Sequence, residues 1–219
     1  MVHPYWPLFD LCIRTPRLEL RFPDDDDATA LAALAAKGIH DPADMPFSQP
    51  WTDAPLGELE RNTLQHFWQI RADWKPTKWR ATFAVVTRDN GRVVGVQGVD
   101  TEDFPILRTG ETGSWVGRAQ QGRGIGKEMR AAVLHFLFAG LGALRATTAA
   151  NDDNAASLAV TRSLGYVENG DDIVLKRDQR ARQLRFKMDR PEWESRRRHD
   201  ITIEGLEPCL AMFGAESAS

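Results

Sequence analysis

Residues 121–127 read Gln-Gly-Arg-Gly-Ile-Gly-Lys and lie between a short strand-like segment at 112–117 and a long amphipathic segment at 125–141. Glycines at the start of a helix let a ligand approach the backbone closely, and the free N–H groups there favour phosphate oxygens. The stretch therefore predicts a strand, a phosphate-binding loop and a helix, in that order.

The spacing of the glycines separates three kinds of phosphate loop. A P-loop needs glycine five positions before Gly126, where this chain has Gln121, and Ser or Thr after the lysine, where it has Glu128. A dinucleotide-binding loop needs a third glycine three positions after Gly124, where this chain has Lys127. Both patterns fail, and the pattern that remains is Gln-x-x-Gly-x-Gly.

The segments around this loop alternate between strand and helix patterns. Strands are predicted at 13–21, 81–88, 92–100, 112–117, 145–150 and 184–188, and Asp89-Asn90-Gly91 indicates a hairpin turn. Helices are predicted at 28–34, 56–74, 125–141 and 154–164. Helices that flank a run of strands indicate an α/β (α+β) sheet domain.

Composition excludes several classes of function. The 219 residues include 28 basic and 31 acidic side chains, and a net charge of −3 gives no field for holding nucleic acid. The longest apolar run, at 131–144, is too short to span a bilayer. Cys12 and Cys209 do not cluster with other metal-binding residues, so no metal site is expected. Without a signal-peptide pattern at its start, the chain is expected to be cytoplasmic.

Four short motifs carry a resemblance to a known family. The loop pattern resembles the pyrophosphate loop of the Gcn5-related N-acetyltransferases (GNAT). The spacing of Asn154, Ser157 and Leu164-Gly165-Tyr166 resembles the branch of RimJ/RimL-like ribosomal-protein acetyltransferases. So do the opening Thr15-Pro16-Arg17-Leu18 and the strand Glu111-Thr112-Gly113-Ser114-Trp115, where Ser114 replaces the usual Tyr. The matches cover residues 13–190, and the chain is also similar to actinobacterial members that use succinyl-CoA.

The resemblance implies a GNAT fold, in which a central twisted mixed β-sheet is splayed open around acyl-CoA and flanked by helices. It implies an acyltransferase domain at 1–190 and a C-terminal extension at 191–219, which packs on the domain or on a second subunit. The residues that it assigns to CoA binding are Trp115, Val116, Gly117, Gln121, Gly122, Arg123, Gly124, Ile125, Gly126, Lys127, Asn154 and Ser157.

The resemblance also implies roles in catalysis. Ser157 would protonate the leaving thiolate, while a carboxylate would take the proton of the amine. The acidic candidates are Asp100, Glu102, Asp103 and Glu111, of which Glu111 and Asp103 are retained. Asn154 and Ser157 also suit a helix start, so both have an alternative reading as caps.

The expected function is transfer of an acetyl or succinyl group from CoA to a primary amine, with no covalent enzyme intermediate. The acceptor amine belongs to a protein N-terminus, a lysine or a small molecule, and neither nucleic acid nor a membrane is an expected partner. The alternative is a non-catalytic acyl-CoA-binding sensor or scaffold. The tryptophans at 51–79 either close the core or line the acceptor pocket. The candidates to hold a succinyl carboxylate are the basic residues Arg71, Lys75, Lys78, Arg80 and Arg108, which could equally face solvent. The apolar pattern after residue 200 makes a homodimer possible.

Overall fold

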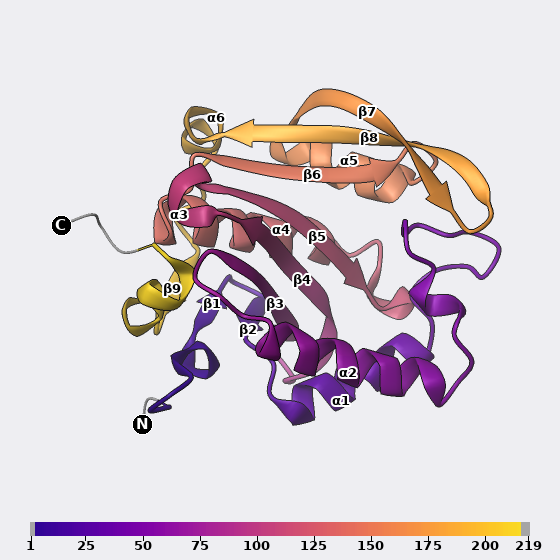
Figure 1. Ribbon diagram of the computed structural model, residues 1–219, viewed down its shortest axis with the longest axis horizontal. Coiled ribbons are helices and arrows are strands. Elements are labelled where there is room, and N and C mark those ends of the chain that lie inside the picture. The colour runs from indigo at the N-terminus through magenta and orange to yellow at the C-terminus, as the bar shows by residue number, and fades with distance from the viewer. Residues whose placement is uncertain (1–2, 216–219) are drawn as a thin grey trace.

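The computed structural model describes residues 3–215, which form one mixed sheet of nine strands with helices on both faces (Figure 1). The strands lie in the order β7-β8-β6-β5-β4-β3-β2-β1-β9. Their bounds are β1 Cys12–Arg14, β2 Leu18–Arg21, β3 Lys78–Thr87, β4 Val93–Glu102, β5 Thr109–Val116, β6 Arg145–Asn151, β7 Val167–Lys176, β8 Gln179–Asp189 and β9 Thr202–Glu204. The helices are α1 Asp25–Ala36, α2 Glu58–Ala72, α3 Phe104–Leu107, α4 Ile125–His135, α5 Ala155–Leu164 and α6 Arg190–Ser195.

Two helical layers bury the two faces of the sheet. On one face, Leu31 of α1 and Phe67 of α2 pack on Ala84 and Val96 of β3 and β4. On the other face, α4 packs its apolar side, including Met129, into the main core. The expected mixed α/β class is therefore confirmed. No helix among the described residues is long and apolar enough to cross a membrane.

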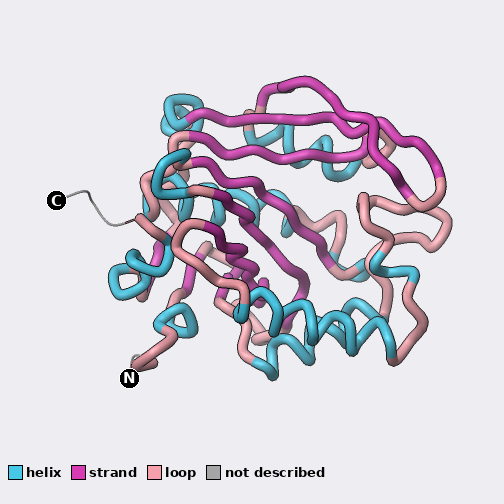
Figure 2. The backbone as a smooth tube through the Cα atoms, in the orientation of Figure 1, coloured by secondary structure: helices cyan, strands magenta, loops and turns pink. Residues whose placement is uncertain are grey.

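The sheet opens between β5 and β6, the pair that matters most for the site. These strands are parallel and pair over only three positions, and the last of them joins Glu111 to Thr147. On its other side β5 stays paired with β4 as far as Val116. Figure 2 shows the two strands side by side at one end and diverging toward the other. From Gly113 to Val116, β5 therefore has an edge that no strand of the described chain covers.

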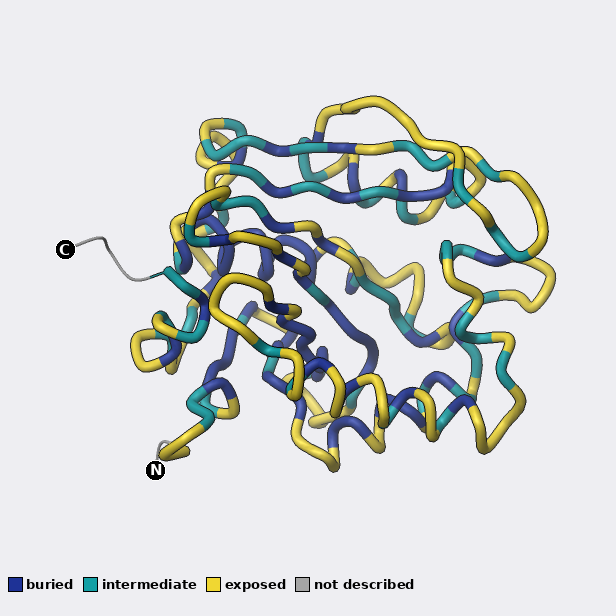
Figure 3. Tube along the Cα trace, viewed as in Figure 1, coloured by how far each residue is buried: buried dark blue, intermediate teal, exposed yellow. Residues whose placement is uncertain are grey.

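The short helices α3 and α6 were not predicted, and three predicted elements differ from the observed ones. The strand predicted at 13–21 is two antiparallel strands, β1 and β2, because Thr15 and Leu18 close a turn around Pro16. The helix predicted at 125–141 is α-helical only to His135 and ends in a π-helical turn, Phe136–Gly140. The strand predicted at 184–188 is part of the longer β8, and its partner β7 was not predicted because that strand is exposed along most of its length (Figure 3).

The C-terminal segment returns to its own sheet. Strand β9 pairs with β1 through Ile203 and Ile13. Beyond it, Phe213 is fully buried, and the indole N–H groups of Trp74 and Trp79 donate to the carbonyl oxygens of Met212 and Phe213. Within the described residues, the extension therefore packs on the sheet and core of its own chain. Residues 216–219 of the predicted extension lie outside the described residues.

Candidate active site

The glycine loop joins the outer end of β5 to α4. Gly122 and Gly124 have φ values of +73° and +78°, a left-handed backbone that residues with a Cβ adopt only with strain. Gly126 lies in the first turn of α4, where an added Cβ would contact Val160 of α5 at 3.8 Å. The loop therefore presents the N-terminus of α4 beside α5, at the outer end of the open edge of β5.

The Gln121 side chain ties this loop to the sheet. Its Nε2 donates to the carbonyl oxygen of Val116 at 2.8 Å and to that of Ile39, just beyond α1, at 2.6 Å. The side chain therefore fixes the loop at the end of β5, which gives a structural reason for glutamine at the first position of the motif.

Thr15, Arg17 and Glu128 form a clamp, which joins the first turn of α4 to the segment between β1 and β2. The buried carboxylate of Glu128 accepts hydrogen bonds from the Thr15 hydroxyl at 2.6 Å and from the Arg17 guanidinium at 2.6 Å. Arg17 also donates to the carbonyl oxygen of Arg123 at 3.1 Å, within the glycine loop. Burial opposes ionisation of Glu128, but these hydrogen bonds outweigh it and hold its pKa below the usual value. The opening Thr-x-Arg-Leu motif thus positions the loop.

The open edge of β5 presents backbone groups to the gap. The Gly117 N–H donates to Val94 of β4, and the Thr112 carbonyl oxygen accepts from the Thr148 hydroxyl of β6. Since the hydrogen-bonding direction alternates along a strand, the backbone groups of Ser114 and Val116 face the gap. This edge has the geometry to accept an extended ligand as an added strand.

The start of α5 faces the same gap from β6. Asn154 caps the helix, because its Oδ1 accepts a hydrogen bond from the Ser157 backbone N–H at 3.1 Å. The structure therefore confirms the capping role of Asn154. Hydrogen bonds among residues 3–215 use neither the Ser157 hydroxyl nor the Asn154 Nδ2 atom, so the cap leaves both groups available to a ligand.

Glu111 lies at the point where β5 and β6 part. It faces Asp100 across the β4–β5 pair and Thr147 across the β5–β6 pair. Partial removal from water and the negative charge of Asp100 raise the pKa of Glu111, while Arg185 acts in the opposite direction. A carboxylate with a raised pKa is better matched to accepting a proton near neutral pH.

His66 of α2 is a titratable group beside this point that sequence reasoning missed. Partial removal from water and the charge of Arg80 lower its pKa, against the opposing effect of Asp100. Arg80 itself donates to the Asp100 carboxylate at 2.7 Å. No local motif surrounds His66, and only the packing of α2 on the sheet brings it to these charges.

Asp103 is not brought to the gap. It is exposed, has a φ of +48° and precedes the short helix α3. It lies three positions after Asp100, which is about 10 Å of extended chain beyond the closed end of the gap. Glu102, another acidic candidate, pairs with Lys78 at 3.1 Å. Of the four acidic candidates, the structure places Glu111 and Asp100 at the gap.

The tryptophans at 51–79 lie in three different settings, and Trp68 of α2 is half exposed and donates to the Asp25 carboxylate. Trp74 and Trp79 stack in the core against the C-terminal tail. Trp51 packs on Trp115 of β5, with ring centroids 6.0 Å apart, and Phe47 packs on Trp51. The rings of Phe47, Trp51 and Trp115 form an aromatic wall on the α1–α2 side of the sheet, at the outer end of β5.

Most of the basic residues expected near a succinyl carboxylate are engaged elsewhere, whereas Lys75 makes no ion pair within residues 3–215. Arg71 pairs with Asp25, and Lys78 and Arg80 pair with Glu102 and Asp100. Arg108, the other candidate, donates to the carbonyl oxygen of Leu141. Tyr166 is buried on the opposite side of the sheet, where its hydroxyl lies 3.0 Å from the Thr112 hydroxyl, so it does not face the acceptor side.

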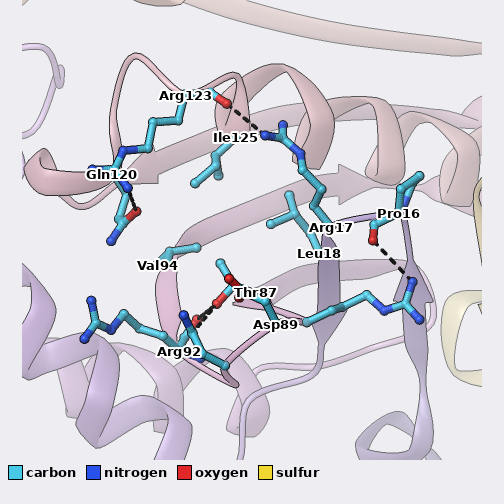
Figure 4. A pocket seen from close by; sticks show the side chains of 12 residues that line it. Pro16, Arg17, Leu18, Thr87, Asp89, Arg92, Val94, Gln120, Arg123 and Ile125 are labelled. Carbon is cyan, nitrogen blue, oxygen red and sulfur yellow. Dashed lines mark hydrogen bonds between the residues drawn. The ribbon is translucent and has the colours of Figure 1, made fainter.

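A basic hollow of about 620 Å³ lies on the other flank of the glycine loop (Figure 4). Its arginines are Arg17, Arg88, Arg92 and Arg123, and its floor comes from β2, β3 and β4. Sheet order places these strands on the far side of β5 from β6. The hollow therefore lies outside the gap between β5 and β6, although Arg123 and Ile125 of the glycine loop line it as well. Among residues 3–215, no group of three or more His, Cys, Asp or Glu side chains is arranged to hold a metal ion.

Comparison with known proteins agrees with this geometry. Mycobacterium smegmatis RimJ in complex with CoA-disulfide superposes with a TM-score of 0.69 at 20% identity, over 85% of this chain and 90% of that one. RimL, a ribosomal L7/L12 alpha-N-protein acetyltransferase solved with coenzyme A, gives 0.64 at 18% identity, over 80% and 95%. A GNAT-family acetyltransferase from Bacillus anthracis gives 0.65 at 15% identity, over 83% and 99%.

These structures share the fold. The sequence pattern described as "Acetyltransferase (GNAT) domain" matches residues 17–167, which run from the Arg17 clamp through the glycine loop and α5 to the start of β7. The matched region therefore contains the open edge of β5, the loop and Ser157. The chain belongs to the GNAT family of acetyltransferases.

Proposed function

We propose that this protein transfers an acyl group from acyl-CoA directly to a primary amine, with both substrates bound together in the gap between β5 and β6. One observation carries the proposal. The pairing of these strands stops at Glu111 and Thr147, so an open strand edge leads from the glycine loop to a carboxylate with a raised pKa. The acyl-CoA donor binds along the open edge of β5, and the amine attacks its thioester beside Glu111.

The donor is anchored at the outer end of the gap. The backbone of residues 121–127 receives the CoA pyrophosphate at the N-terminus of α4, where the helix dipole and the N–H groups favour negative charge. The pantetheine arm runs inward along Trp115, Val116 and Gly117 and pairs with the outward-facing backbone of Val116. Asn154, on the other side of the gap, supplies its Nδ2 to the arm.

The chemistry needs one base and one acid. Glu111 accepts the proton of the incoming amine, which then attacks the thioester carbonyl. A backbone N–H of β5 polarises that carbonyl. The C–S bond breaks and its electron pair stays on sulfur. Ser157 donates a proton to the thiolate and regains one, by way of water, from the amine nitrogen as the amide forms. Ser157 lies in the first turn of α5, where the positive end of the helix also favours negative charge.

Acetyl-CoA is the donor that the site favours. A succinyl group ends in a carboxylate, which needs a cation or several hydrogen-bond donors if it is to be buried. Arg71, Lys78 and Arg80 are already paired with carboxylates. Comparing kcat/KM for acetyl-CoA and succinyl-CoA tests this choice, and a clear preference for succinyl-CoA would reverse it.

The acceptor is a primary amine presented from the α1–α2 side, past the aromatic wall of Phe47, Trp51 and Trp115. RimL is named as an alpha-N-protein acetyltransferase, which makes protein N-termini the first class of acceptor to test, before lysines and small amines. The two cysteines, Cys12 and Cys209, are buried and free, which supports a reducing compartment such as the cytoplasm.

The assay for this function is release of CoA thiol when acetyl-CoA is mixed with each amine, with mass spectrometry of the acceptor. Initial rates that give intersecting double-reciprocal lines support a ternary complex, whereas parallel lines indicate a covalent intermediate. Tight acetyl-CoA binding with no thiol release above buffer for any amine class would instead identify a non-catalytic binding module.

Two charge substitutions identify the base. Arg185 lowers the pKa of Glu111, so Arg185→Gln should move the acid limb of the kcat/KM profile to higher pH if Glu111 accepts the proton. Arg80 lowers the pKa of His66, so Arg80→Gln should move that limb upward if His66 is the base instead. A limb that moves only in Arg80→Gln would contradict the role of Glu111.

A further inference from the structure

Arg130 of α4 is a buried cation in the wall of the gap. Only 4% of the residue is exposed. Its Nη2 donates to the Ser114 hydroxyl of β5 at 3.0 Å, and its Nη1 donates to the Thr161 hydroxyl of α5 at 2.9 Å. The guanidinium therefore connects the two elements that line opposite sides of the gap.

No negative charge compensates this guanidinium among the described residues. Its two partners are neutral hydroxyls, and its Nε is buried without a hydrogen-bond partner. Tyr166 is the titratable group of the surrounding elements whose charge acts on it, and burial raises the pKa of that phenol, so it stays neutral. Burial also lowers the pKa of Arg130, yet arginine stays protonated in proteins. Because an unpaired buried charge is costly, a functional reason for it is expected.

The position of Ser114 indicates where this charge acts. Ser114 lies in the uncovered segment of β5, one residue further inward than the segment assigned to the pantetheine arm. The glycine loop lies at the outer end of that segment and Glu111 at the inner end. A donor that enters at the loop and extends toward Glu111 therefore brings its sulfur to the inner part of the edge, beside Ser114.

We propose that Arg130 acts through the Ser114 hydroxyl to stabilise the thiolate of CoA as the acyl group leaves. The inference rests on the proposed function, because it requires CoA in this gap. Arg130 donates to the Ser114 oxygen, which leaves the hydroxyl proton free to point toward sulfur. When the C–S bond breaks, the electron pair on sulfur meets that proton and the positive potential behind it. Ser157 then supplies the proton that converts thiolate to thiol, so Arg130 is a positioning residue.

The test is the pKa of the CoA thiol in the binary complex, read from the ultraviolet absorbance of the thiolate as pH is raised. The same protein loaded with desulfo-CoA serves as the blank for tyrosine absorbance. A free alkyl thiol titrates near pH 8.5, about as cysteine does. The wild-type protein should lower this pKa, and Arg130→Gln should raise it again by about one pH unit. Arg130→Lys, which keeps the charge, should retain part of the shift.

Two further variants keep the test decisive. Ser114→Ala removes the link without removing the buried charge, and it should also raise the thiol pKa; it carries the test if Arg130→Gln does not fold. Arg92→Gln removes a positive charge on the far flank of the loop and should leave the thiol pKa unchanged. A folded Arg130→Gln or Ser114→Ala protein that binds CoA with the wild-type thiol pKa would overturn this proposal alone. Failure of the wild-type protein to bind CoA would overturn the proposed function as well.

Discussion

Replacing Glu128 with glutamine tests whether the clamp on α4 sets the geometry of the glycine loop. Glu128 is 5% exposed, and its carboxylate accepts from the Thr15 hydroxyl and from both the backbone N–H and the guanidinium of Arg17. Glutamine keeps the size and one acceptor oxygen but turns an NH₂ group toward the donors of Arg17. The variant therefore leaves donors without acceptors in a buried place.

The magnitude follows from the number and kind of hydrogen bonds lost. A hydrogen bond to a charged group contributes about 1.5–3 kcal/mol net. The Arg17 side chain is 55% exposed, so solvent weakens the contribution of its hydrogen bonds to stability. Loss of two such bonds, discounted in this way, costs roughly 3 kcal/mol. For a chain of this length each kcal/mol shifts the melting temperature by about 2–4 °C, so Glu128→Gln should melt roughly 6–12 °C lower.

Scanning calorimetry with and without CoA measures both consequences. Because Arg17 also holds the Arg123 carbonyl oxygen, the loop should loosen and CoA affinity should fall along with stability. Glu58→Gln, at the exposed first turn of α2, is the matched control and should change neither quantity. A melting temperature within 2 °C of wild type at neutral pH, about what 1 kcal/mol produces, would refute the account of the clamp.

The pH dependence provides an independent check of the same group. The folded-state pKa of Glu128 lies below its usual 4.5, so its stabilising contribution is fully present above pH 4.5. That contribution is lost as pH falls through the folded-state pKa. The stability difference between wild type and Glu128→Gln should therefore shrink progressively below pH 4.5. A difference that stays constant down to the acid transition would contradict this role.

Three further substitutions test the packing of the C-terminal tail, the role of the buried Tyr166 and the attachment of the loop at residues 42–53. Phe213→Ala removes a fully buried ring from the tail and should cost about 4 kcal/mol in chemical denaturation, whereas a loss under about 1 kcal/mol would contradict the packing of the tail on its own sheet. Tyr166→Phe removes the hydrogen bond to Thr112 and should cost about 1 kcal/mol while leaving kcat unchanged; a large fall in kcat would reassign it to catalysis. Arg177→Gln breaks the two-fold hydrogen bond to the Asp53 carboxylate, so limited proteolysis should cut residues 42–53 faster without a change in melting temperature, and unchanged cleavage would argue against this tether.

The parts of the site that sequence predicted are those with local chemistry. Positions 122 and 124 of the loop favour glycine because their backbone has a positive φ. The hairpin at Asp89-Asn90-Gly91 joins β3 to β4, as predicted. From sequence, Asn154 and Ser157 could be helix caps or CoA-binding residues. The structure shows that Asn154 caps α5, while the Ser157 hydroxyl makes no hydrogen bond within residues 3–215. In each case the deciding contacts lie within a few residues.

The parts that sequence did not predict depend on contacts between distant segments. Arg130 follows an apolar residue in an amphipathic helix, and its burial arises only because Ser114 and Thr161 come from other elements. The clamp joins Thr15 and Arg17 to Glu128 across more than a hundred residues. Strand β7 lacks the apolar alternation that reveals a strand, since both of its faces are largely exposed.

Calorimetric titration of CoA into the wild-type protein, Gly124→Val and Arg92→Ala tests whether CoA binds at the glycine loop. Valine at position 124 would need a left-handed backbone and would place its Cβ 3.4 Å from Arg17, so the loop cannot keep its shape. We expect Gly124→Val, with its fold verified by circular dichroism, to bind CoA at least about tenfold more weakly, whereas Arg92→Ala should bind as the wild type does. Unchanged affinity in Gly124→Val, or a loss in Arg92→Ala alone, would show that CoA binds elsewhere.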